Sequence, residues 1–399
     1  MPGMTGSSTP LLGGVSRRLG LAAAGLDSLA PRSIRDWIEG IRGGRLDPAE
    51  TAAATTFVFR MWVVALFLKA LGSGWDVAWH FRFIRDDFAP PHNINLVGDG
   101  IAIALVLFHW YTRLAVDRLA LRLMAGGASL FVLSAPIDVI NHRINGLDIT
   151  SWSITHFGLY VGTGIMMAGV IRAFTLHSAG RSDRTFLLGA YWFFFLENVW
   201  FPNQHQEYGV EEIASWDRGH PYAEQSLLDF AANQIGRPVD RVSLVAFSLP
   251  VPAWVYPLWI VAAAGITLMV ARRSVGLRWT ATVLGLAYLA WRCVLFPLFV
   301  VTGFPTSAVP FVVVAAGLAV DLVSRVRLPW LAEAAAGAAL VTLLVYGGLF
   351  LQSEVLVAPP VSYWSAPVAA VVLFVLWAGV RRGASLLEGA PLRASSPSS

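Results

Sequence analysis

Two groups of acidic and imidazole side chains recur along this chain with the same order and nearly the same spacing. Each group has one aspartate and two histidines: Asp76, His80 and His92, then Asp138, His142 and His156. Residues four apart lie on one face of a helix about one turn apart. The spacing therefore predicts that the aspartate and first histidine of each group lie side by side. The last histidine of each group would join them from the head of the following segment.

Two imidazoles and one carboxylate form a well-known metal-binding set that leaves positions open for a small ligand. A polar cluster held by hydrogen bonds is the simpler reading, but it would have to explain why the same set forms twice. We therefore predict metal at both groups, with the first group, Asp76, His80 and His92, also catalytic. Imidazole suits copper, iron, nickel and zinc, and the order of affinities favours copper. Copper is the predicted cofactor, with iron or zinc as alternatives.

The composition indicates which kind of protein positions these residues. The 399 residues are 56% hydrophobic and only 14% charged, whereas soluble domains carry about 25% charge. A membrane-spanning helix needs roughly 20 apolar residues, and such runs recur after residue 52. We predict an all-α, polytopic integral membrane protein of about ten spans built from repeated helical hairpins: 53–80, 93–113, 120–142, 155–176, 184–202, 247–271, 278–302, 306–324, 329–352 and 362–380.

The distribution of arginine predicts the orientation of these spans, because cytoplasmic loops are enriched in positive charge. Arginines precede the first span, follow the last one and fill alternate loops, while the intervening loops are neutral, mixed or acidic. This pattern predicts a multi-pass protein of the cell membrane with both termini cytoplasmic and both metal sites near the outer face. The net charge of +4 comes from these arginine-rich loops and does not indicate a nucleic-acid partner.

The predicted spans divide the chain into regions. Residues 1–52 form a cytoplasmic arm, with a short amphipathic helix at 33–41 against the lipid headgroups, and 53–382 form the transmembrane domain. Within that domain we expect metal-site hairpins at 53–176, a third hairpin at 184–271 with a large outer loop at 203–246, and C-terminal hairpins at 278–382; a short helix is expected at 223–235, and a disordered tail at 383–399.

An internal repeat would explain the recurrence of the two groups. Asp76, Asp138 and Glu197 fall near the outer ends of the first, third and fifth spans, at nearly equal intervals along the chain. The third copy lacks histidine at the matching positions, so the chemistry is expected in the first four spans.

Other ionisable residues receive structural interpretations. Lys69, the only lysine, is predicted to form a buried ion pair with Asp99 or Asp76, because an isolated charge inside a membrane is costly. Among the remaining histidines, two near the cytoplasmic ends of their spans are read as structural and two in the 203–246 loop as solvated: His109 and His177, then His205 and His220.

The first group of residues lies in a segment that is similar to the copper-site segment of the C subunit of particulate methane and ammonia monooxygenases. That family shows Asp-x3-His, a linker with Arg-Asp and Asp-Phe, and Pro-x-His. Here the linker is one residue shorter and ends in Pro90-Pro91-His92. The family's second motif has Asn-x3-His and a later histidine followed by an aromatic residue and glycine. Phe157 and Gly158 follow His156 here, and Asp138 stands where the family has asparagine.

The resemblance covers roughly residues 53–176 and implies copper ligation and oxygen-dependent oxidation or hydroxylation of a small lipophilic substrate. The family works as a three-subunit complex with a cupredoxin subunit, so the resemblance also implies partner membrane subunits or cupredoxin-like subunits besides the lipid bilayer. The six later spans have no counterpart in that subunit.

Two other functions remain open on the residues. One is a non-oxidative membrane metalloenzyme in which a metal-bound water is the nucleophile. The other is a copper-handling or transport protein. Soft Cu(I) prefers thioether and thiolate ligands, but the seven methionines are scattered and Cys293 is the only cysteine, which argues against transport. No third acid converges on the first group, which argues against hydrolysis. The copper-dependent membrane monooxygenase is the preferred interpretation.

Overall fold

The structure is a computed structural model that describes residues 33–84, 88–145, 150–178 and 180–388, without the side chains of 142–145 and 384–388. Every regular element in these ranges is a helix. In chain order they are α2 (Ile34–Arg42), α3 (Pro48–His80), α4 (Pro90–Thr112), α5 (Arg118–Asn145), α6 (Ile154–His177), α7 (Arg184–Asp217), α8 (Gln225–Gln234), α9 (Arg241–Ser248), α10 (Val255–Trp259), the π-helical η1 (Ile260–Ala264), α11 (Gly265–Val275), α12 (Thr280–Val301), α13 (Val312–Val323), α14 (Trp330–Val355), the 3-10 turn η2 (Tyr363–Ser365) and α15 (Ala366–Glu388).

Eight of the described helical segments are long and apolar enough to cross a membrane, which indicates a multi-pass membrane protein. They are α3, α4, α5, α6, the continuous α10–η1–α11, α12, α14 and η2–α15. Two of the ten expected spans are missing from this set. α13 has 12 residues, fewer than a full crossing needs. The expected span 184–202 is the first part of α7, which continues into a polar stretch.

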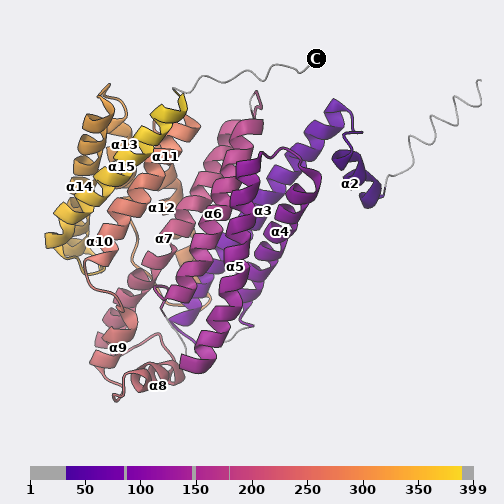
Figure 1. Cartoon of the computed structure of the whole chain (residues 1–399). Coiled ribbons are helices and arrows are strands. Elements are labelled where there is room, and N and C mark those ends of the chain that lie inside the picture. The colour runs from indigo at the N-terminus through magenta and orange to yellow at the C-terminus, as the bar shows by residue number, and fades with distance from the viewer. Residues whose placement is uncertain (1–32, 85–87, 146–149, 179, 389–399) are drawn as a thin grey trace, which may run out of the picture.

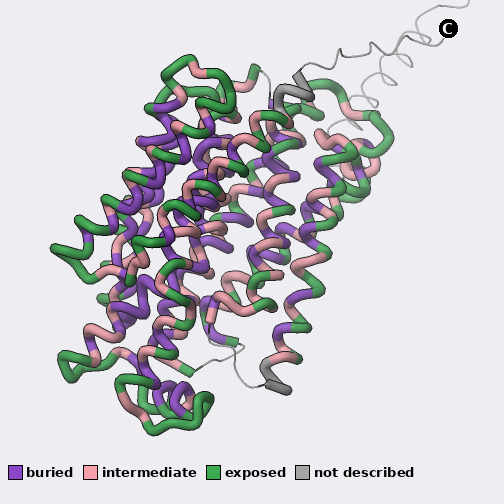
Figure 2. The backbone as a smooth tube through the Cα atoms, turned by 60° about the vertical axis from the view of Figure 1, so that its left-hand side comes forward, coloured by how far each residue is buried: buried purple, intermediate pink, exposed green. Residues whose placement is uncertain are grey.

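The long helices lie side by side, and the first and last described helices reach the same end of the array (Figure 1). α2 and the end of α15 lie there, whereas α8 and α9 lie at the opposite end (Figure 1). Buried residues concentrate between the helices, and exposed residues follow their outer faces and the terminal loops (Figure 2). Many exposed side chains on the outer faces are large and apolar, such as Leu343 and Val371, as expected of lipid-facing surfaces.

The first two hairpins, α3–α4 and α5–α6, are held together by close backbone contacts at glycines. A Cβ atom added to Gly98 of α4 would lie 2.9 Å from the carbonyl oxygen of Ala65 in α3. A Cβ atom added to Gly162 of α6 would lie 2.8 Å from the carbonyl oxygen of Gly127 in α5. Only glycine permits this approach, because it has no Cβ. The two contacts occupy equivalent positions in the two hairpins. The number of residues from Ala65 to Gly127 nearly equals the number from Gly98 to Gly162.

The helix predicted at 33–41 is present as α2, but it contacts protein. Ser33 caps its N-terminus through the Asp36 amide. Trp37 stacks on Phe108 of α4 with ring centroids 6.1 Å apart, so this side of the helix packs against α4. Ile34 remains 80% exposed. The N-terminal arm is thus partly docked on the helix array.

The expected outer loop at 203–246 is largely helical. α7 does not end near Pro202 but runs on to Asp217, and α8 forms where the short helix at 223–235 was predicted. Side-chain donors from neighbours satisfy backbone groups around the proline, as the Trp259 indole does for the Val199 carbonyl at 2.7 Å. Such compensation is how long membrane helices tolerate proline.

The C-terminal region also differs from expectation at one point. α15 continues through 383–388 to Glu388, where the sequence predicted a disordered tail. The rest of that predicted tail and most of the N-terminal arm lie outside the described residues.

Candidate metal centre

Local sequence places the first Asp/His group at a helix–helix corner. α3 ends at His80, so Asp76 and His80 occupy its last turns. Pro90 and Pro91 open α4, where their missing amide hydrogens and fixed φ angles are tolerated. His92 follows in the first turn of α4, facing the end of α3. The intervening residues 85–87, which include the Arg-Asp part of the linker motif, lie outside the described residues.

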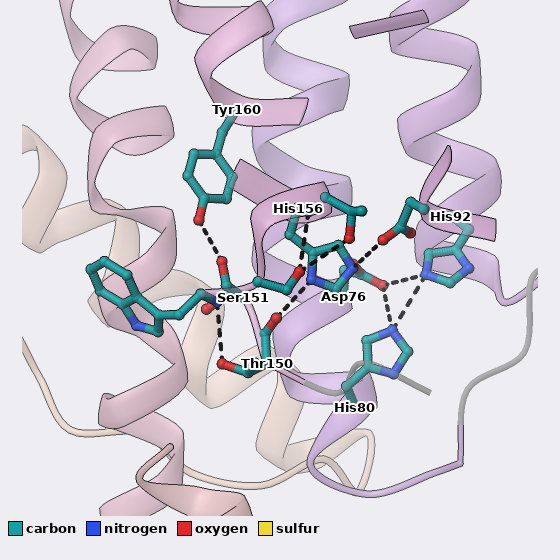
Figure 3. A network of polar contacts seen from close by, with 11 residues as sticks. Asp76, His80, His92, Thr150, Ser151, His156 and Tyr160 are labelled. Atoms are coloured by element: carbon teal, nitrogen blue, oxygen red, sulfur yellow. Dashed lines mark hydrogen bonds and ion pairs between the residues drawn. The ribbon is translucent and has the colours of Figure 1, made fainter. Parts of the chain in front are cut away.

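The three predicted ligands of this first group converge. Asp76 Oδ1 lies 3.3 Å from His80 Nε2 and 2.8 Å from His92 Nε2. The two Nε2 atoms are 3.4 Å apart, and all three potential ligand atoms lie within 4.8 Å of one another. Figure 3 shows the three side chains pointing toward a common point.

The geometry of this triad fits a bound metal ion. Three donors, each about 2.0 Å from one ion and at tetrahedral angles, would be about 3.3 Å apart, close to the three distances above. The donor set of one carboxylate and two neutral imidazoles suits copper, iron or zinc. The side chains retain 19% to 21% exposure, so a small ligand can reach them.

The second Asp/His group is described in part. Asp138 of α5 is 3% exposed, and its Oδ1 lies 3.4 Å from His156 Nε2 in the first turn of α6. His156 Nδ1 lies 2.7 Å from the Thr150 carbonyl oxygen, which orients the ring so that Nε2 faces the aspartate. The His142 side chain lies outside the described residues, so two of the three predicted ligands are placed.

Both groups line one cavity of about 650 Å³ between α3, α4, α5, α6 and α7. Its wall is otherwise mainly apolar, with side chains such as Leu66, Phe131, Met167 and Phe194. Figure 3 presents the first triad and His156 within the same close view. The two groups, which are far apart in sequence, therefore belong to a single chamber.

The predicted ion pair of Lys69 is confirmed, and its partner is Asp99. The Lys69 ammonium contacts the Asp99 carboxylate, and both side chains are about nine-tenths buried. Lys69 Nζ also lies 4.4 Å from the centre of the Phe131 ring, a favourable cation–π arrangement. Both charged residues line the cavity. Because Lys69 lies about two turns before Asp76 in α3, the two are separated by roughly 10 Å along the helix axis.

A buried ionic cluster beside the cavity was not predicted. Arg292 of α12 and Glu207 of α7 pair at 2.7 Å and are almost wholly buried. Glu207 also accepts hydrogen bonds from the Trp200 indole at 2.7 Å and the Tyr256 hydroxyl at 3.0 Å. The sequence did indicate that Arg292 needs a buried partner, because this charged residue stands inside an apolar run. Its partner was hidden because 203–246 was read as a loop.

His205 was expected to be a solvated loop residue, and that prediction was wrong. It lies in α7, is 3% exposed, and its Nε2 is 3.1 Å from the Phe247 carbonyl oxygen. It lines the cavity together with Glu197, which accepts a hydrogen bond from Gln204 at 2.9 Å. Pro202 obscured this arrangement, because an internal proline usually signals the end of a helix.

The other histidines behave as expected of structural or surface residues. His109 is fully buried and accepts a hydrogen bond at Nε2 from the Trp62 indole, 3.1 Å away. His177 Nδ1 lies 2.9 Å from the Ala173 carbonyl, and His220 is exposed.

Trp75 and Trp79, adjacent to the first triad in sequence, pack away from it. Trp75 contacts Phe299, in the last turn of α12, and Phe304, just after that helix. The ring centroids are 6.4 Å and 5.9 Å from that of Trp75. This aromatic layer anchors the metal-site end of α3 to the C-terminal half of the molecule.

Comparisons with protein-family models, with curated proteins and with solved structures find no match for this chain.

Proposed function

We propose that this protein is a copper-binding integral membrane protein that catalyses oxygen-dependent oxidation or hydroxylation of a small lipophilic substrate. The observation that carries the proposal is the convergence of Asp76 Oδ1, His80 Nε2 and His92 Nε2 at the wall of an apolar cavity. The resemblance of this segment to the C subunit of particulate methane and ammonia monooxygenases supports copper over iron or zinc. It also supports partner membrane or cupredoxin-like subunits.

Each part of the chamber has a role in this proposal. A bound copper ion would supply the redox chemistry with dioxygen, held by Asp76, His80 and His92. The apolar wall binds the hydrocarbon part of the substrate and excludes water from it. His156, oriented by the Thr150 carbonyl, and Asp138 provide ligands for a second ion. The Lys69–Asp99 pair adds a buried charged patch to this mainly apolar wall.

The finer topology belongs to the same proposal. Counting α7 and α13 as crossings gives ten spans arranged as repeated hairpins, with both termini cytoplasmic and the metal sites near the outer face of the cell membrane. Two features support it. α2 and the end of α15 lie toward one end of the helix array, opposite α8 and α9 (Figure 1). The equivalent glycine contacts of α3–α4 and α5–α6 are those expected of duplicated hairpins.

Metal analysis of detergent-purified protein tests the central claim. Wild-type protein should carry up to two ions, identified by elemental analysis and by electron paramagnetic resonance after oxidation. His92→Ala should remove about one ion and His156→Ala the other. His177→Ala is a matched control, because that histidine is exposed at the far end of α6.

Three outcomes decide between the readings. Unchanged metal content in both cavity variants would overturn the metal assignment. Zinc in place of copper would favour the non-oxidative metalloenzyme. Copper without reductant-dependent oxygen consumption on any lipophilic substrate would favour copper handling.

A further inference from the structure

A second hollow of about 570 Å³ lies at the end of the molecule opposite the metal-site cavity. It forms where the ends of α11, α13 and α15 meet the start of α14 (Figure 1). Four of its lining residues are arginines and one is an acid: Arg272, Arg273, Arg327 and Arg381, with Glu333. We refer to it as the arginine pocket.

Two of these arginines are held in place by acidic side chains, of which Asp321 is buried. Arg272 Nε lies 3.1 Å from Oδ1 of Asp321, which is 1% exposed, and Arg381 pairs with Glu333 at 2.9 Å. Asp321 also accepts hydrogen bonds from the Thr282 amide and hydroxyl, each at 2.7 Å. The pairs fix two guanidinium groups at the wall.

The other two arginines and a helix terminus add donors to the same place. Arg273 and Arg327 are exposed at the mouth of the pocket. α14 begins here after Pro329, and no side chain caps its N-terminus. Backbone amides at a helix N-terminus favour anions, and the guanidinium fork matches phosphate oxygens with two parallel hydrogen bonds. The pocket thus combines preorganised and adaptable phosphate donors.

Exposed apolar side chains stand in the lining of the pocket, at Val326, and directly after it in the chain, at the start of α14. Val326, Trp330 and Leu331 are 57%, 39% and 49% exposed. Basic pockets between transmembrane helices bind anionic lipid headgroups, whose acyl chains would cover such apolar side chains. We propose that the arginine pocket binds a phosphate-bearing anion, with the headgroup of an anionic phospholipid as the favoured source. This site is independent of the metal centre and of any activity there.

Native mass spectrometry of the delipidated full-length protein tests the proposal. The protein is titrated with phosphatidylglycerol, with zwitterionic phosphatidylcholine, and with phosphatidylglycerol in the presence of inorganic phosphate. The double variant Arg273→Gln/Arg327→Gln keeps the Arg272–Asp321 and Arg381–Glu333 ion pairs and should bind phosphatidylglycerol about tenfold or more weakly. Arg278→Gln/Arg382→Gln removes the same charge near the same end, outside the pocket, and should bind as wild type.

The arms of the titration separate the sources of phosphate. Binding of phosphatidylglycerol without competition by millimolar phosphate supports a lipid headgroup, and competition supports a free phosphate compound. Equal binding by wild type and the pocket variant, equal loss in the control, or no preference over phosphatidylcholine would overturn the proposal. Arg327→Gln alone serves if the double variant does not fold, and should weaken binding by a smaller factor.

Discussion

The α3–α4 and α5–α6 hairpins use the same framework with different polar contents. Both bring an aspartate near the end of one helix to a histidine in the first turn of the next. Both close on a glycine contact at equivalent positions. The first hairpin contains the ion pair Lys69–Asp99. When the two hairpins are aligned on their glycine contacts, the equivalent positions of the second hairpin hold Phe131 and Thr163.

This difference separates what the framework requires from what the site requires. Glycine contact and the Asp/His corner occur in both hairpins, so they belong to the shared framework. The buried ion pair occurs in one hairpin only, so close packing of such a hairpin does not need it. Yet Phe131 lies against the Lys69 ammonium, so the two hairpins meet at the position where they differ most.

The largest expected effect concerns which Asp/His group performs chemistry. Asp76→Ala and His80→Ala each remove a ligand from the converged triad, and should abolish oxygen-dependent activity and one bound ion. Asp138→Asn, which restores the residue of the resembled family, should retain metal and much of the activity. Oxygen consumption and product formation in membranes with a reductant measure both. Full activity in His80→Ala would move the catalytic assignment to the second group.

The next effect tests whether the first hairpin can adopt the polar content of the second. Lys69→Met leaves Asp99 buried without its partner and should destabilise the protein by about 3 to 5 kcal/mol. The double variant Lys69→Phe/Asp99→Thr copies the second hairpin and should recover most of that loss. Thermal unfolding in detergent measures both variants. A double variant no more stable than the single one would show that the pair, and not mere charge balance, holds α3 to α4.

A smaller effect tests the shared glycine contact. Gly98→Ala and Gly162→Ala place a Cβ atom within 3 Å of facing backbone, and each should destabilise by about 1 to 3 kcal/mol. Gly100 and Gly126 have open space at the Cβ position. Gly100→Ala and Gly126→Ala should be neutral or stabilise by up to about 1 kcal/mol through helix propensity. Similar losses at all four positions would refute the contact as the cause.

The smallest expected effect is on the pH dependence of stability, and it comes from a residue of α7, outside both hairpins. It serves as a control, because it should leave the metal content unchanged. Burial raises the pKa of the Glu212 carboxyl, which lies in the last turns of α7 beyond the expected span 184–202, from 4.5 to about 7. Between those pH values the folded protein holds a proton that the unfolded chain has lost. The free energy of unfolding contributed by Glu212 therefore falls as pH rises through this window.

Glu212→Gln removes this titration, so its melting temperature in detergent should decline less than that of wild type between pH 4.5 and about 7. Metal content should stay at the wild-type value in this variant, because Glu212 does not line the metal-site cavity. An identical pH dependence in wild type and variant would contradict the assignment of the raised pKa to this carboxyl.

Features governed by local spacing were predictable from the sequence. Helix geometry places residues four apart on one face, so the pairing of Asp76 with His80 followed from numbering alone. Prolines are tolerated at the start of a helix. The Pro90-Pro91 pair therefore also made it predictable that His92 lies in the first turn of α4. Apolar composition predicted the helical membrane class, and an amphipathic stretch at 33–41 predicted α2.

Features governed by distant packing were decided only by the tertiary structure. Lys69 had two plausible partners, and the register of α4 against α3 selected Asp99. The helix through Pro202 persists because donors on other helices, such as Trp259, satisfy backbone groups near it. That continuity buries Glu207 against Arg292, which is distant in the chain. The shared cavity and the arginine pocket have the same origin, because each is lined by helices whose mutual placement no local pattern encodes.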